Sequence, residues 1–107
     1  MMNHQKQTEL ILALDCEDRK TALELMEPLQ GHLKWVKIGL QMFTAYGLPL
    51  VQEIKSMGYN VFLDLKLHDI PNTVAKTILS LSSASIDLLT IHAIGGSEMC
   101  AYAVKAR

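Results

Sequence analysis

Short apolar segments alternate with amphipathic segments along the whole chain. Four of the apolar runs are nearly continuous and rich in leucine, isoleucine and valine, and they recur at nearly equal intervals. Runs of this length and composition are typical of parallel strands that are buried on both faces. The pattern predicts strands over residues 9–15, 33–38, 60–66 and 87–93.

Each apolar run is followed by a segment whose apolar residues recur at helical spacing. Asp18 and Ser97 are expected to cap the first and last of these helices, and Gly58 is expected to end the second. The second helix is interrupted near residues 47–49, and Pro28 either begins a new turn or bends the first helix. The predicted helices cover residues 21–27, 40–57, 71–81 and 98–107.

The alternation of strands and helices predicts βα units and a parallel sheet, which is the α/β class. Four such units form half of a (β/α)₈ TIM barrel, a fold that typically needs about 250 residues. The 107-residue chain stops within its last helical pattern. We therefore expect residues 9–107 to be the N-terminal half of such a barrel, preceded by a polar tail over residues 1–8. The alternative is a complete, small, open α/β domain with four strands.

The composition suits a folded domain, since 50% of the residues are hydrophobic and 20% are charged. A net charge of −1 gives no general attraction to nucleic acid or to an acidic membrane surface. Residues 1–8 do not resemble a signal peptide, and no apolar run approaches the ~20 residues of a membrane helix. Cys16 and Cys100 form neither a metal-type pair nor a disulfide framework. We expect free thiols in a cytoplasmic protein.

Charged residues gather where the predicted strands end. Asp15 ends the first strand, Lys37 lies near the end of the second, and Asp64 and Lys66 end the third. Side chains at i and i+2 of a strand share a face, and the carboxyl ends of parallel strands meet at one edge of the sheet. These residues are therefore expected to converge on one cavity mouth. The alternative, a structural salt bridge or solvated charges, is weaker because all four lie at the same end of consecutive strands.

Several common kinds of site lack their signatures here. No glycine-rich loop follows the first strand, where Asp15 and Glu17 would repel an anion, and no serine elbow is present. The carboxylates and His92 can attract a divalent cation, but the interleaved lysines would compete with it. Alternating carboxylates and ammoniums instead hold an ammonium charged and fixed, ready to stabilise or protonate a developing carbanion.

Residues 64–73 have the sequence Asp-Leu-Lys-Leu-His-Asp-Ile-Pro-Asn-Thr. This stretch resembles the active-site motif of the orotidine 5′-phosphate decarboxylase family. Residues 12–15, residues 36–39, and residues 90–93 with the glycine pair that follows are similar to its first, second and fourth strand-end motifs, in the same order. The likeness runs from about Leu10 to the end of the chain. Ile94 is a minor departure, because this family often has a small residue there.

The resemblance implies a (β/α)₈ barrel that works as a homodimer, with sites at the subunit interface and with no cofactor or metal. Its reaction would be the loss of CO₂ from orotidine 5′-phosphate to give UMP, in de novo pyrimidine biosynthesis. The phosphate-binding arginine and the closing lid of the family would lie beyond Arg107. We therefore expect little activity from these 107 residues alone.

The resemblance also implies roles for individual residues. Lys66 would protonate C6 of the substrate, held between Asp64 and a second carboxylate, and Asp64 would lie beside the substrate carboxylate and orient the lysines. Lys37 would join this charge network and contact the ribose, and Asp15 would bind a ribose hydroxyl. The second carboxylate, Asp69, would reach the site of the neighbouring subunit together with two nearby residues, Ile70 and Thr73.

Two other functions remain open. A decarboxylase of sugar acid phosphates shares a similar Asp-x-Lys-x-x-Asp pattern but uses Mg²⁺, and residues 68–73 favour the orotidine branch instead. The other is a non-catalytic half-barrel fragment. The histidines carry less weight: His4 belongs to the tail, His32 faces solvent, His68 packs away from the site, and His92 makes a structural hydrogen bond.

Overall fold

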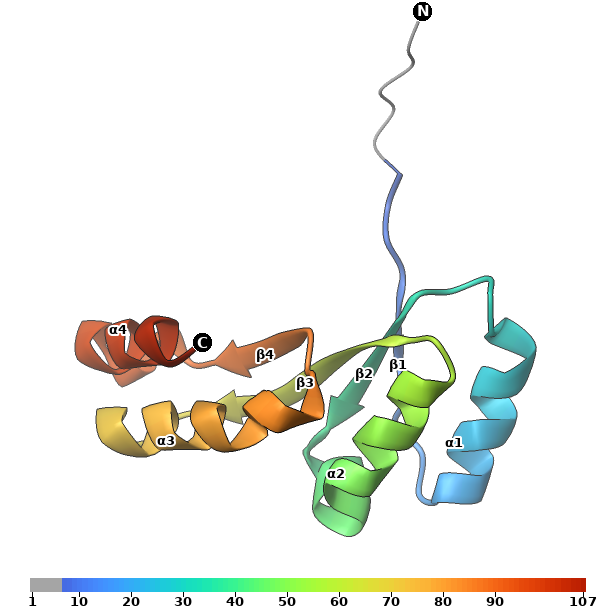
Figure 1. The fold of residues 1–107 in the computed structure, drawn as a ribbon, viewed down its shortest axis with the longest axis horizontal. Helices are drawn as coiled ribbons and strands as arrows, with labels where there is room; N and C mark the ends of the chain where they lie inside the picture. The colour runs from blue at the N-terminus through green and yellow to red at the C-terminus, as the bar shows by residue number, and fades with distance from the viewer. Residues whose placement is uncertain (1–6) are drawn as a thin grey trace, which may run out of the picture.

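The computed structural model describes residues 7–107, which contain one parallel sheet in the order β1-β2-β3-β4 (Figure 1). Every neighbouring pair of strands is parallel. This architecture confirms the α/β class and the four βα units. Most of the predicted polar tail, including His4, lies outside the described residues. The strands are β1 (Ile11–Ala13), β2 (Trp35–Gly39), β3 (Asn60–Leu67) and β4 (Leu88–Ile91).

Four helices follow the strands, and three of them are joined to short 3₁₀ turns. The helices are α1 (Arg19–Met26), α2 (Leu40–Ser56), α3 (Pro71–Leu81) and α4 (Ser97–Ala106). The turns are η1 (Glu27–Leu29), η2 (Ser82–Ala84) and η3 (Ala93–Gly95).

The predicted helix signals are mostly present. Asp18 caps α1, because its Oδ1 accepts a hydrogen bond of 2.8 Å from the backbone N–H of Thr21. Pro28 begins a new turn, since it lies in η1 directly after α1. The predicted cap at Ser97 is wrong: Gly96, in the left-handed region with φ of 100°, precedes the first helical residue of α4, and no side chain caps that helix. The backbone turn at Gly96 takes the place of a side-chain cap.

The predicted interruption of the second helix is a kink at Gly47. This residue has φ of 63° and ψ of −155°, which only glycine adopts without strain. Pro49 follows two residues later, in the first turn after the kink, where its missing backbone N–H costs no helical hydrogen bond. Gly58, with φ of 94°, then ends the helix as predicted.

One face of the sheet is covered by α1 and α2. Along β2 and the first half of β3 the buried residues alternate with half-buried ones, so Val36 and Ile38 face the helices while Trp35 and Lys37 face the other way. Buried residues from the strands and from the helices pack together and form the larger core. They are Leu14, Ala22, Met26, Val36, Ile38, Met42, Leu50, Val51, Ile54, Tyr59, Val61, Leu63 and Leu81.

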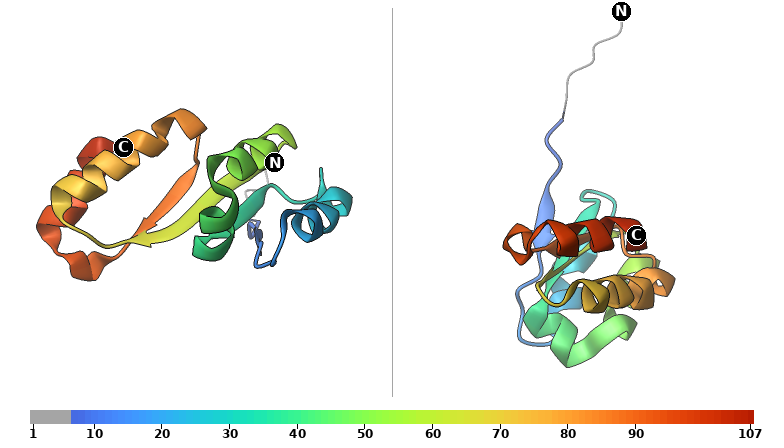
Figure 2. Two further views of the ribbon diagram at one scale, coloured as in Figure 1. Left: turned by 90° about the horizontal axis from the view of Figure 1, so that it is seen from below. Right: turned by 90° about the vertical axis from the view of Figure 1, so that its left-hand side faces the viewer.

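A second, smaller core lies at the other end of the molecule. Val74 of α3 packs with Met99 and Ala103 of α4, and Leu67 of β3 joins them. The two helices lie side by side there, away from α1 and α2 (Figures 1 and 2). Gly95 keeps η3 close to this core, because a β-carbon at that position would collide with the sulfur of Met99. β3 is therefore shared by both cores.

An ion pair joins the elements at the amino ends of the strands. Asp87 Oδ2 accepts hydrogen bonds from Lys55 Nζ at 2.7 Å and from the backbone N–H of Val61 at 2.8 Å. This link ties α2 and β3 to the segment that enters β4. It lies at the end of the sheet opposite the charged residues described next. Within residues 7–107, no helix has the length and apolar character that a membrane span requires.

Candidate active site

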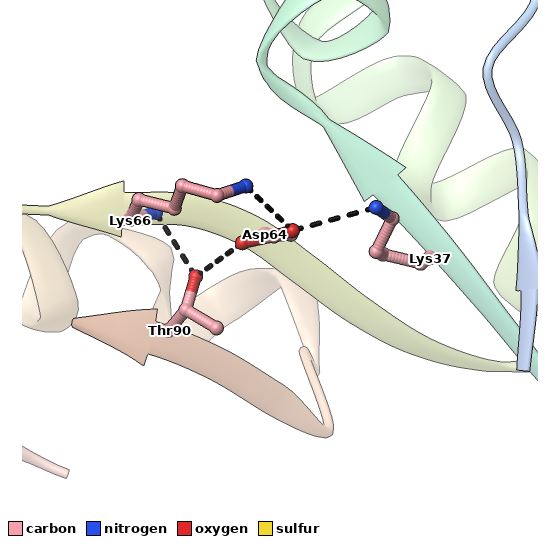
Figure 3. Close-up of polar contacts among 4 residues, drawn as sticks. All are labelled: Lys37, Asp64, Lys66 and Thr90. Carbon is pink, nitrogen blue, oxygen red and sulfur yellow. Dashed lines mark hydrogen bonds and ion pairs between the residues drawn. The ribbon is translucent and has the colours of Figure 1, made fainter. Parts of the chain in front are cut away.

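The carboxyl ends of β2, β3 and β4 bring three of the predicted site residues together (Figure 3). Asp64 Oδ2 lies 2.8 Å from Lys66 Nζ and 3.5 Å from Lys37 Nζ. Because Gly39 is paired with Asp64 in the sheet, Lys37 lies two residues back on the neighbouring strand. Its side chain reaches Asp64 from one side, and Lys66 reaches it from the other (Figure 3).

Asp64 is buried, with 7% of its surface exposed, and it is the one charged residue of the described chain in that class. A buried carboxylate is costly unless it is paired and hydrogen-bonded. Lys66 satisfies one oxygen, and the hydroxyl of Thr90 donates a 2.7 Å hydrogen bond to the other. The hydrogen bond from Lys66, followed by that from Thr90, holds the pKa of Asp64 below its ordinary value of 3.8.

This lowered pKa makes stability depend on pH. A carboxyl whose folded-state pKa lies below its unfolded-state value stabilises the protein fully above the unfolded-state pKa. That contribution is lost as the pH falls from about 4 through the folded-state pKa. We expect the free energy of unfolding, measured by urea titration at a series of pH values, to fall over this range. Asp64→Asn should make the free energy of unfolding depend less steeply on pH in this range. An unchanged slope of that free energy against pH in the variant would rule out Asp64 as the source of the dependence.

Lys66 has an unusual backbone. Its φ of 51° places it in the left-handed region, which is uncommon for residues other than glycine. The pairing of β3 with β4 shifts register between Leu63 and Leu67, so the ladder is interrupted at this point. The backbone N–H of Lys66 instead donates to Thr90 Oγ1 at 2.9 Å. The ammonium end remains accessible, because 54% of the Lys66 side chain is exposed.

Thr90 is the site residue that the sequence interpretation missed. It lies within the predicted fourth strand, over residues 87–93, and the charge pattern alone assigns it no part in the cluster. Its hydroxyl bridges the carboxylate of Asp64 and the backbone of Lys66 (Figure 3). The signal that pointed to it was its position two residues before His92, at the same end of the sheet as the charges.

The other predicted site residues lie outside this cluster. Asp15 follows β1 and is exposed, and a β-carbon built on Gly39 would lie 3.9 Å from its Oδ1. The carboxylate of Asp69 accepts a 2.7 Å hydrogen bond at Oδ1 from the backbone N–H of Ile70. The expected pairing of Lys66 with Asp69 is absent among the described residues. Two further residues, Ile70 with 68% of its surface exposed and Thr73, present their side chains at the surface.

The histidines and cysteines make none of the contacts described above for the charge cluster. The rings of His68 and His92 lie 5.6 Å apart, centroid to centroid, with a tilt of 50° between their planes. Over residues 7–107 the predicted hydrogen bond of the His92 ring is not found, and ring packing takes its place. Cys16 and Cys100 are free thiols as predicted, and burial together with Asp18 raises the pKa of Cys16. No three potential metal ligands are grouped within this part of the chain.

Comparison with known proteins identifies relatives of this chain. The profile of the family "Orotidine 5'-phosphate decarboxylase / HUMPS family" matches residues 8–107. A protein of Opitutus terrae named orotidine 5′-phosphate decarboxylase is 50% identical over 99 residues, which are 92% of this chain and 43% of that protein. A protein of the same name from Ehrlichia chaffeensis is 53% identical over 90 residues, 84% of this chain and 39% of the relative.

Solved structures share the fold. The crystal structure of orotidine 5′-phosphate decarboxylase from Lactobacillus acidophilus superimposes with a TM-score of 0.84 at 35% identity, covering 94% of this chain and 45% of that one. An uncharacterized conserved protein from Geobacillus kaustophilus gives a TM-score of 0.85 at 38% identity, with coverages of 90% and 45%. The four βα units thus correspond to part of a (β/α)₈ barrel. The chain spans less than half the length of the relatives that it matches.

Proposed function

We propose, since this chain belongs to the orotidine 5′-phosphate decarboxylase / HUMPS family, that residues 9–107 supply the proton-donating half of an orotidine 5′-phosphate decarboxylase barrel. The reaction converts orotidine 5′-phosphate and a proton to UMP and CO₂ without a cofactor. The observation that carries this proposal is the exposed ammonium of Lys66, held 2.8 Å from the buried carboxylate of Asp64.

Decarboxylation needs a cation at the carbon that loses CO₂. The bond between C6 and the carboxylate breaks, and its electron pair stays on C6. An ammonium fixed beside that carbon stabilises the charge as it develops, because it needs no reorganisation at the moment of reaction. Lys66 then gives a proton to C6, so that its N–H bond breaks as the new C–H bond forms, and solvent returns a proton to the amine.

Asp64 has two effects in this scheme. Its carboxylate accepts a 2.8 Å hydrogen bond from the ammonium of Lys66, which holds the proton donor in a fixed position. Placed beside the substrate carboxylate, it also disfavours the ground state relative to the transition state, in which that carboxylate becomes neutral CO₂. Lys37, 3.5 Å from the same Asp64 oxygen, completes the network and contacts the ribose.

The remaining residues take substrate-binding roles in the proposal. Asp15, exposed after β1, binds a ribose hydroxyl. Asp69, Ile70 and Thr73 lie on the surface between β3 and the first turn of α3. Their exposure, and the lack of a described contact from Asp69 to Lys66, support a contribution to the site of a second subunit in a homodimer. A cytoplasmic setting in pyrimidine biosynthesis follows from the same function.

The test uses a chimera in which this chain replaces the matching part of the Opitutus terrae relative. We expect the chimera to decarboxylate orotidine 5′-phosphate, followed by the change in ultraviolet absorbance, with the same rate in the presence of EDTA. The unmodified relative is the positive control. A folded chimera without this turnover would contradict the proposal. Turnover of a sugar acid phosphate that stops with EDTA would support the Mg²⁺-dependent alternative instead.

A further inference from the structure

We propose that Thr90 is a positioning residue of this site, whose single hydroxyl fixes both the carboxylate of Asp64 and the backbone of Lys66. The inference rests on the proposed function for its effect on the reaction. Its geometric basis is independent: two hydrogen bonds that meet at Thr90 Oγ1, one of 2.7 Å to Asp64 Oδ1 and one of 2.9 Å from Lys66 N.

The direction of both hydrogen bonds follows from the groups involved. An ionised carboxylate only accepts, and a backbone N–H only donates, whereas a hydroxyl has one proton and two lone pairs. Thr90 therefore donates to Asp64 and accepts from Lys66 at the same time. A side chain of the same shape without the hydroxyl, such as valine, makes neither bond.

The hydroxyl also takes the place of a missing sheet partner. Regular pairing between β3 and β4 is lost between Leu63 and Leu67, which would leave the N–H of Lys66 without an acceptor. A residue other than glycine is strained in the left-handed region and persists there only where its surroundings hold it. Thr90 supplies that contact, since β4 places it beside Lys66 in the stretch where the register shifts, which we call the bulge (Figure 3).

The carboxylate of Asp64 is thereby oriented. With Oδ1 held by Thr90, the other oxygen, Oδ2, faces both ammonium groups at 2.8 and 3.5 Å. Without Thr90 the carboxylate is free to rotate, and the backbone of Lys66 is free to leave its left-handed conformation. Both changes move the ammonium away from C6, and a displacement of about 1 Å can cost 10²-fold in rate.

The experiment compares Thr90→Val and Thr90→Ser in the chimera. We expect Thr90→Val to lower kcat by about 10²-fold with little change in KM, because the positions of reacting groups change rather than the binding contacts. Thr90→Ser keeps the hydroxyl and should restore kcat to within a few-fold. Thr77→Val is the matched control: its hydroxyl bonds to the backbone carbonyl of Thr73 within α3, and its loss should leave kcat unchanged.

A second readout does not depend on turnover. In carbon-detected NMR titrations of the folded chimera, Thr90→Val should raise the pKa of the Asp64 carboxyl, and Thr90→Ser should return it. A Thr90→Val protein with unchanged kcat and unchanged Asp64 titration would overturn the inference. If the parent chimera has no decarboxylase activity, the proposed function fails while the titration still tests the positioning. If Thr90→Val does not fold, Thr90→Ala removes the same hydroxyl and carries the same expectations.

Discussion

Replacing Lys66 with alanine is expected to lower kcat for orotidine 5′-phosphate by about 10⁴-fold. A general acid typically contributes 10²–10⁴-fold, and a preorganised charge at the reacting centre contributes a further part. Lys66 combines both roles in the proposed mechanism, so this single substitution should have the largest effect of any at the site. The change is measured in the chimera by steady-state kinetics with orotidine 5′-phosphate.

Two further variants sharpen this prediction. Lys66→Arg keeps a positive charge but replaces the donor with a guanidinium that stays protonated in proteins, so it should recover little of the activity. Lys76→Ala removes an exposed ammonium from α3 and should leave kcat unchanged. If Lys66→Ala retained kcat within tenfold of the parent, another group would have to donate the proton.

Replacing Leu63 with alanine is expected to lower the free energy of unfolding by about 2–5 kcal/mol, the usual range for a leucine truncated in a core. Leu63 is fully buried in the larger core and lies next to Asp64 on β3. Because a domain is stable by only about 5–15 kcal/mol, this loss is a large fraction of the total. The quantity is read from urea denaturation followed by circular dichroism, in the same chimera.

The control is an equivalent truncation at the surface. Leu79 on α3 has 57% of its surface exposed, so Leu79→Ala should change the free energy of unfolding by about 0.5 kcal/mol or less. The comparison isolates burial, because both substitutions remove the same atoms. If the two variants unfolded at the same midpoint urea concentration, the face of β3 toward α1 and α2 would not be a packed core.

The repeated pattern of strands and helices could be predicted because its cause is local. Apolar periodicity and the glycines and prolines that interrupt it are visible in the chain itself. The bounds of β2 and β3 and the start of α3 therefore agree with the prediction to within two residues. The first and fourth strands are shorter than predicted: β1 covers Ile11–Ala13 and β4 covers Leu88–Ile91. Single backbone hydrogen bonds extend beyond both strands, from the N–H of Leu14 to Lys37 and from the N–H of His92 to Leu67, but regular pairing does not continue there.

The site was only partly predictable. The spacing of Asp64 and Lys66 and the position of Lys37 were enough to bring three charges together. The left-handed backbone of Lys66 was not visible, since no glycine marks it and the bulge arises from pairing with β4. The role of Thr90 depends on that same bulge, and the orientation of Asp69 depends on a hydrogen bond to its own loop. The first two features depend on contacts between β3 and β4, whereas the third is a hydrogen bond between adjacent residues.

The division of the chain into two cores affects the mechanics of the charge cluster. β3 packs its first half, with Val61 and Leu63, into the larger core, whereas Leu67 joins the smaller one. Leu65 also packs on the larger core, so Asp64 lies on the part of β3 that belongs to that core, and Lys66 lies where the strand passes to the smaller one. A rotation of one core against the other would therefore act on the ion pair between Lys66 and Asp64, whereas the ion pair between Lys37 and Asp64 would stay on the side of the larger core.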